Sequence, residues 1–126
     1  MTHLLLVAAG GAIGAAGRHL VSGGALKLFG SGFPHGTLIV NVLGSFMMGL
    51  LIAWLALRAT HGGGNLRLFL ATGVLGGFTT FSAFSLDVVL LWERGLVEKA
   101  ILYAVLSVAV SIAALVAGLA LGRSFG

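Results

Sequence analysis

Three hydroxyl side chains recur at four-residue spacing near the C-terminal end of the chain: Tyr103, Ser107 and Ser111. Residues four apart lie on one face of an α-helix, so these groups would form a polar stripe on an otherwise apolar helix. Such a stripe can donate hydrogen bonds to an ion that has lost its water. The alternative is that the hydroxyls bond back to their own helix backbone, the common arrangement of serine in membrane helices.

Phenylalanine and asparagine side chains offer two further contacts to an anion. Phe81 and Phe84 lie three residues apart and therefore share a helical face, with the hydroxyl of Ser82 nearby. The edge of an aromatic ring is electropositive and attracts an anion in a dry site. Asn41 carries the only amide within the apolar segments, and its NH₂ group is a donor. The alternatives are core or lipid packing for the phenylalanines and a hydrogen bond to a neighbouring helix for Asn41.

The middle of the third apolar segment combines Gly76 and Gly77 with Thr79 and Thr80. Adjacent glycines and β-branched threonines are poor helix formers, so we expect a non-helical break from about Gly76 to Thr80. A break frees backbone carbonyls where no water can satisfy them. Carbonyls of Gly76 and Thr79 from two copies of the chain would suit a hard cation such as Na⁺. The alternative is a kinked but continuous helix whose carbonyls accept hydrogen bonds from nearby hydroxyls.

These groups belong to a chain whose composition excludes an ordinary soluble surface. Of its 126 residues, 59% are apolar and only 8% are charged, whereas soluble proteins carry about 25% charged residues. Four apolar segments, each near the roughly 20 residues that cross a bilayer, occupy about residues 4–21, 36–57, 66–91 and 97–121. We therefore expect an all-α integral membrane protein. Residues 1–126 would form a single domain of four transmembrane helices, the third broken at its centre.

Several other classes of function are not expected. The Lys and Arg residues are scattered singly, which argues against nucleic-acid binding. Cysteine is absent, so disulfides and thiolate metal sites are impossible. No cluster of His, Asp and Glu has metal-ligand spacing and no nucleophile has a base nearby, so we expect no enzyme. If the fourth segment is counted from Ala100, Asp87 is the only acid inside an apolar segment, and we expect it to pair with an arginine near the membrane interface.

Positive charge is balanced across the expected membrane. Counting crossings places three cations on each side: Arg58, Arg67 and Arg123 against Lys27, Arg94 and Lys99. Orientation follows the difference between such counts, which here is zero, or one if Arg18 is included. We therefore expect insertion in both orientations and an antiparallel homodimer. Insertion in one weakly favoured orientation is the alternative. Arg18, near the end of the first segment, would anchor the helix at the headgroups or make a vestibule electropositive.

Glycine accounts for 21 of the 126 residues, more than twice its usual share of about 7%. Small residues four apart let membrane helices approach closely. Such pairs recur along the chain: Gly10/Gly14, Ser45/Gly49, Gly73/Gly77 and Gly118/Gly122. For Gly118/Gly122, the general frequency of glycine in membrane helices is a sufficient explanation. Under either explanation we expect tight packing between helices.

Taken together, the motifs resemble the CrcB or Fluc family of fluoride-specific channels. The similarity covers nearly the whole chain and rests on the runs GGAIGAAGR at 10–18, GTLIVNVLGSF at 36–46 and GGFTTFS at 76–82, with Phe84. The resemblance implies an antiparallel, dual-topology homodimer with two pores and a buried Na⁺ held by the carbonyls of Gly76 and Thr79. It also implies a fluoride pathway, along which we place Asn41, Phe81, Phe84, Ser82, Thr37, Tyr103, Ser107 and Ser111.

The resemblance further implies passive export of fluoride across a bacterial inner membrane. Fluoride enters cells as HF and is trapped as the anion, so a channel lets it leave down its electrochemical gradient. The chain departs from the family pattern at His19, where an aromatic is usual, and at Ala83, where a hydroxyl residue is usual. The change at Ala83 would weaken one hydrogen-bonding contact along the pathway.

Two other functions remain as alternatives. A small proton-coupled multidrug exporter can also be a four-helix, dual-topology dimer, but it needs an acidic residue in its first helix. Residues 4–21 contain none. A small non-transporting subunit of a larger assembly is the other possibility, and it has no need of a central break or a polar stripe.

Overall fold

The computed structural model describes residues 1–57 and 63–125, and every regular element in that part of the chain is helical. Arg58 and His61 lie outside the described residues. Four helices are long and apolar enough to cross a membrane: Thr2–Phe29, His35–Leu57, Gly64–Glu93 and Val97–Ser124. The prediction of an all-helical, multi-pass membrane protein is therefore confirmed.

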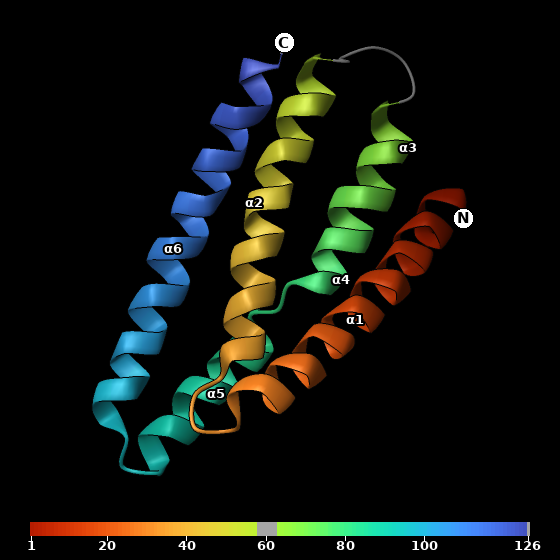
Figure 1. Ribbon diagram of the computed structural model, residues 1–126. Helices are drawn as coiled ribbons and strands as arrows, with labels where there is room; N and C mark the ends of the chain where they lie inside the picture. The colour runs from red at the N-terminus through yellow and green to blue at the C-terminus, as the bar shows by residue number, and fades with distance from the viewer. Residues whose placement is uncertain (58–62, 126) are drawn as a thin grey trace.

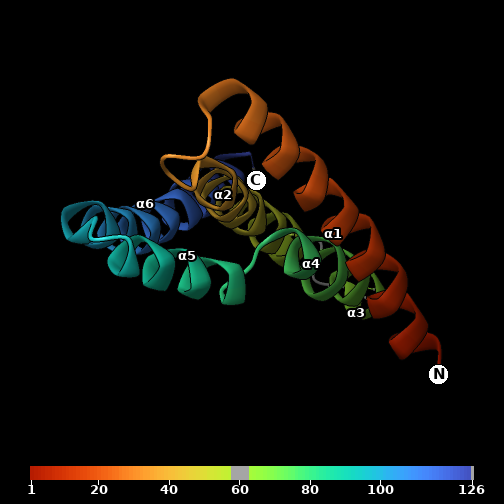
Figure 2. The same cartoon turned by 90° about the horizontal axis from the view of Figure 1, so that it is seen from below.

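Successive crossings run in opposite directions through the bundle (Figure 1). In chain order the elements are α1 (Thr2–Phe29), α2 (His35–Leu57), α3 (Gly63–Arg67), the π-helix η1 (Leu68–Leu75), α4 (Gly76–Phe78), α5 (Ser82–Glu93) and α6 (Val97–Ser124). Helix α2 lies between α1 and α6, as both views show (Figures 1 and 2). It packs mainly against α6, while α1 packs mainly against η1.

Glycines with positive φ mark two of the turns. Gly30 (φ 78°) ends α1 and its N–H bonds to the carbonyl oxygen of Leu26. Gly95 (φ 80°) separates α5 from α6. A side chain strongly disfavours this backbone region, so both turns suit glycine. Helix α1 continues to Phe29, beyond the expected end near Val21, because a glycine within a helix costs only about 1 kcal/mol and the chain turns away only at Gly30.

Glycine also sets the contact between α2 and α6. A Cβ atom on Gly49 would collide with the carbonyl oxygen of Leu115, and one on Gly118 would collide with the carbonyl oxygen of Phe46. Gly122 is buried on the same face of α6. The general frequency of glycine in membrane helices is therefore not a sufficient explanation for Gly118/Gly122, since the backbone of α2 passes too close to admit a side chain.

The contact between α1 and the third crossing depends on glycine in the same way. A Cβ on Gly10 would lie 2.9 Å from the Cα of Gly73, and a Cβ on Gly14 would collide with the carbonyl oxygen of Val74. Gly11, on another face of the helix, has open space around its Cβ position. The predicted close approach of these glycine-rich helices is confirmed.

The third crossing is not a uniform α-helix. Its first part, η1, is π-helical over eight residues, a form that is rare and concentrated at functional sites. Helix α4 ends at Phe78, and Thr79 has an extended backbone with φ −87° and ψ 159°. Helix α5 then begins at Ser82, and the chain between α4 and α5 runs as a short connection (Figure 1). Residues 79–81 are thus outside any helix, whereas Gly76 to Phe78, included in the expected break, are helical.

Apolar side chains face outward on every crossing, as expected of a protein surrounded by lipid. Leu20, Leu86, Val105 and Ile112 are all exposed in the single chain. The main buried cluster is small and lies between α5 and α6; it consists of Phe84, Leu91, Ala100 and Tyr103. This cluster places two of the predicted pathway residues, Phe84 and Tyr103, side by side.

Candidate functional site

A cavity of about 310 Å³ opens beside the junction of α4 and α5, and we call it the inner cavity. Its lining comes from α2, from the segment around the junction and from α6: Asn41, Ser45, Thr79, Thr80, Phe81, Phe84, Ser107, Val108, Ser111 and Ile112. Six of these residues were singled out from the sequence, namely Asn41, Thr79, Phe81, Phe84, Ser107 and Ser111. The fold therefore brings together groups that are far apart along the chain.

Five other predicted residues do not line the inner cavity. Ser82 is exposed, with its Oγ 3.3 Å from the Oγ1 of Thr80. Thr37 lines a second cavity, which is described below. Tyr103 is fully buried and is in the lining of neither cavity. Of the remaining two, Gly76 is the first residue of α4 and Arg18 lies on α1.

Two serine hydroxyls at the inner cavity have no internal partner. The Oγ atoms of Ser107 and Ser111 are buried, and neither bonds to any group in the described part of the chain. The alternative in which they bond back to their own helix is therefore not what the structure contains. A buried hydroxyl without a partner costs about 1–3 kcal/mol. Both hydroxyls are consequently available to a bound ligand.

The side chain of Asn41 holds the backbone of the α4–α5 connection. Its Nδ2 donates to the carbonyl oxygen of Thr80 at 2.9 Å, and its Oδ1 accepts from the N–H of Thr80 at 2.8 Å. The predicted alternative, a hydrogen bond to a neighbouring helix segment, is thus present. One N–H of the Asn41 amide remains, because Nδ2 carries two hydrogens. The amide can therefore brace the connection and still donate toward the cavity.

Thr80 is not among the site residues predicted from the sequence. Its hydroxyl caps the N-terminus of α5. Its Oγ1 accepts from the N–H of Ala83 at 3.2 Å, the contact that a capping threonine makes at a helix N-terminus. A threonine just before the start of an apolar helix is the sequence signal for this role. The hydroxyl of Thr79 instead donates to the carbonyl oxygen of Leu75 at 3.0 Å. Both hydroxyls therefore stabilise the irregular backbone.

Arg18 contacts the same region from α1. Its Nε donates to the carbonyl oxygen of Gly77 at 3.1 Å. Because α1 continues to Phe29, Arg18 lies well inside the helix and not near its end, where the sequence had placed it. The contact satisfies a carbonyl at the C-terminal end of α4, where a positive charge is favourable.

Aromatic rings form a row from the surface to the interior. The ring centroids of Phe81 and Phe84 are 5.4 Å apart, and those of Phe84 and Tyr103 are 5.3 Å apart. Phe81 is 75% exposed in the single chain, whereas Phe84 is 9% exposed. The hydroxyl of Tyr103 donates to Oδ2 of Asp87 at 3.0 Å. Asp87 forms no ion pair with an arginine among the described residues, so the expected pairing is wrong: α6 presents a closer donor.

The fold and this site define a small multi-pass membrane protein with a donor-lined cavity beside an interruption in one crossing. Membrane proteins tolerate such irregular backbone where it is buried in protein or lines a polar cavity. The arrangement is that of a channel or transporter. It offers neutral donors and ring edges, which suit a small anion.

The chain belongs to the CrcB-like family. The family model described as CrcB-like protein, Camphor Resistance (CrcB), matches residues 5–119. A protein of Mesorhizobium japonicum named fluoride-specific ion channel FluC is 57% identical over 108 residues, which cover 86% of each chain. A protein of Agrobacterium fabrum with the same name is 54% identical over 124 residues, which cover 98% of each chain. A relative from a Chelativorans species, also so named, is 58% identical over 108 residues.

Proposed function

We propose that this chain is a passive, highly selective fluoride channel, and not an enzyme, that exports cytoplasmic fluoride across a bacterial inner membrane. The observation that carries the proposal is its similarity over nearly its whole length to proteins named fluoride-specific ion channels. The inner cavity supports it, because the cavity combines free hydroxyls, an amide and ring edges. No observation favours the multidrug exporter, and α1 contains no acidic residue.

The proposed pathway runs along the face shared by α5 and α6. Phe81 and Phe84 would present ring edges to fluoride. Ser107 and Ser111 would donate hydrogen bonds, since their hydroxyls have no other partner among the described residues. The hydroxyl proton of Tyr103 is directed to the carboxylate of Asp87. Fluoride contact with Tyr103 would therefore require that this hydroxyl turn away from Asp87.

Asn41, Ser82 and Thr37 complete the pathway residues in this proposal. Asn41 would donate its remaining N–H to fluoride while it holds the connection in place. Ser82 and Thr37 would contact the ion toward the two ends of the cavity system. Selectivity follows because these donors replace the strongly held hydration shell of fluoride in a passage too narrow for chloride.

Arg18 would supply the positive charge of a vestibule. Its Nε is occupied by Gly77, but the two terminal nitrogens of its guanidinium have no partner in the described part of the chain. The charge therefore stays available to raise the local concentration of anions.

The proposed functional unit is an antiparallel homodimer inserted in both orientations. Phe81 supports this arrangement, because a pathway residue that is 75% exposed in the single chain needs a second wall. The balanced cations on the two sides of the membrane also support it. Tags at both termini should be accessible from both faces of intact cells. Protection of each terminus on one face only would contradict dual topology.

A sodium ion is proposed at the dimer interface, held by the carbonyls of Gly76 and Thr79. The residues fit this role, because no donor among the described residues bonds to either carbonyl oxygen. When bound, sodium would neutralise these oxygens from two copies of the chain. Replacing sodium by a large organic cation should lower the melting temperature of the dimer, and equal melting in both buffers would contradict the site.

The experiment that tests the function is fluoride efflux from liposomes. Purified protein is reconstituted in liposomes loaded with potassium fluoride, and a potassium ionophore is added to permit charge balance. An external electrode should record rapid fluoride release, with no chloride release from matched liposomes. No release of either ion from folded dimer would exclude the channel and direct attention to proton-coupled transport of cationic drugs.

A further inference from the structure

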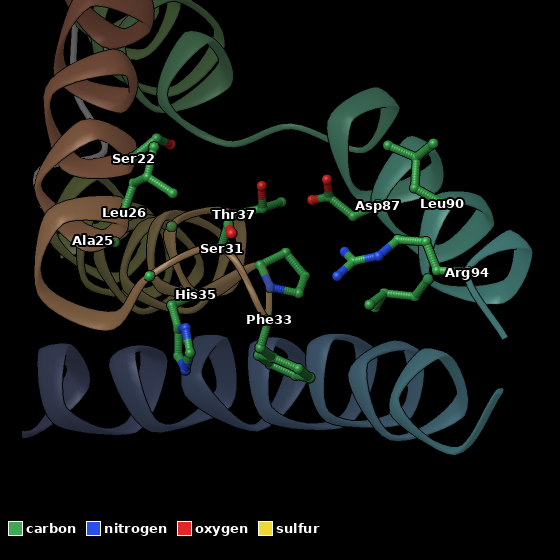
Figure 3. Close-up of a pocket in the computed structure, with 14 residues that line it drawn as sticks. Ser22, Ala25, Leu26, Ser31, Phe33, His35, Thr37, Asp87, Leu90 and Arg94 are labelled. Atoms are coloured by element: carbon green, nitrogen blue, oxygen red, sulfur yellow. The ribbon is translucent and has the colours of Figure 1, made fainter. Parts of the chain in front are cut away.

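A second cavity, of about 300 Å³, lies at the end of the bundle where α1 ends and α2 begins. We call it the mouth cavity. Its lining includes Thr37 from α2 and Asp87 and Arg94 from α5. Figure 3 shows the carboxylate of Asp87 and the guanidinium of Arg94 directed into the same space. The two groups form no ion pair among the described residues. Asp87 accepts the hydrogen bond of Tyr103, whereas the charge of Arg94 stays available to an ion in the cavity.

Tyr103 contacts a residue of each cavity: Asp87 of the mouth cavity and Phe84 of the inner cavity. Its side chain is completely buried, and its hydroxyl bonds to Asp87 at 3.0 Å. Thr37 of the mouth cavity and Ser107 of the inner cavity face this same hydroxyl. An ion that leaves the inner cavity past Tyr103 therefore enters the mouth cavity beside Asp87.

The carboxylate of Asp87 opposes the passage of an anion. It lies beside Tyr103, whose hydroxyl bonds to it, and an ionised carboxylate repels an anion. Arg94 is the one Lys or Arg that lines this cavity, whereas the nearby cations Lys27 and Lys99 do not line it. His35 lines the opposite side and points away from Asp87 (Figure 3). Compensation of the Asp87 charge thus depends on Arg94.

We propose that Arg94 makes the mouth cavity an anion-recruiting site for small anions such as fluoride. This inference rests on the proposed function and adds a residue that the sequence motifs do not include. A cation at a pore entrance raises the local concentration of anions and their rate of entry. The effect is electrostatic, so it depends on the charge at position 94 and weakens as salt screens it.

The test uses an Arg94→Cys variant, because the chain contains no other cysteine. Arg94 is exposed, so a thiol there can be modified on the purified, assembled protein with methanethiosulfonates that carry either a positive or a negative charge. Each product is reconstituted and its fluoride efflux measured at low ionic strength. A Lys99→Cys variant, treated in the same way, controls for charge at the same end of the bundle but outside the cavity.

The positive adduct at position 94 should support efflux close to that of the unmodified channel, and the negative adduct should be roughly 3- to 10-fold slower. High concentrations of an impermeant salt should reduce this difference, and the Lys99→Cys products should be equal. Equal efflux from the two Arg94→Cys products, or failure of this variant to assemble, would overturn the proposal. Absence of fluoride efflux from the wild-type chain would instead contradict the proposed function itself.

Discussion

Substitution of Phe81 or Phe84 by isoleucine is expected to reduce fluoride efflux to the level of protein-free liposomes. Isoleucine fills a similar space but has no electropositive ring edge, so it cannot replace the water that fluoride loses. Phe81 is 75% exposed in the single chain, so its substitution should leave the packing within the single chain unchanged. Phe84 is packed in the buried cluster, where isoleucine should cost about 1.5 kcal/mol or less.

A matched control for Phe81 is Phe125→Ile, which changes a side chain that is 79% exposed at the C-terminal end of α6. This variant should conduct as the wild type does. All variants should elute as dimers, which shows that lost efflux is not lost assembly. Normal efflux from both Phe81→Ile and Phe84→Ile would remove the phenylalanines from the pathway.

Asn41→Ala is expected to abolish efflux by a different route. It removes both hydrogen bonds to the backbone of Thr80. Each lost bond costs about 1 kcal/mol net, and a buried backbone group left without a partner costs about 1–3 kcal/mol. The connection between α4 and α5 should then lose its fixed geometry, and with it the position of Phe81. The dimer should also melt at a lower temperature.

Ser45→Ala is the matched control for Asn41→Ala. Ser45 lies one turn further along α2 and lines the same cavity, but its hydroxyl makes no hydrogen bond within the described part of the chain. Its removal should change neither efflux nor melting. Efflux from Asn41→Ala within about twofold of wild type would show that the amide neither braces the connection nor contacts fluoride.

Local sequence properties predict the four crossings and most of the glycine contacts. A run of apolar residues is sufficient to indicate a spanning helix. Small residues four apart indicate close packing, as Gly10 and Gly14 show. At Gly118 the general frequency of glycine is not a sufficient explanation. Whether a glycine meets a partner depends on how α2 crosses α6, and no local pattern records that crossing.

Contacts between residues far apart in the sequence account for the other differences between the predicted and the observed site. Asn41 and Thr80 are separated by 39 positions, and Arg18 and Gly77 by 59 positions. Periodicity identifies Asn41 and Arg18 as unusual in an apolar segment but cannot name their partners. Asp87 was expected to find an arginine, yet the packing of α5 on α6 brings the hydroxyl of Tyr103 to it first. The π-helical form of η1 also lacks a recognisable local signal.

The most direct test of the account is the reversal potential of a current across a planar bilayer that contains the purified dimer. With a fluoride gradient and equal chloride on both sides, a passive fluoride channel should carry current that reverses at the equilibrium potential of fluoride. The current should persist without a proton gradient. Reversal at the chloride potential, or transport that requires a proton gradient, would contradict the central claim that this chain is a selective fluoride channel.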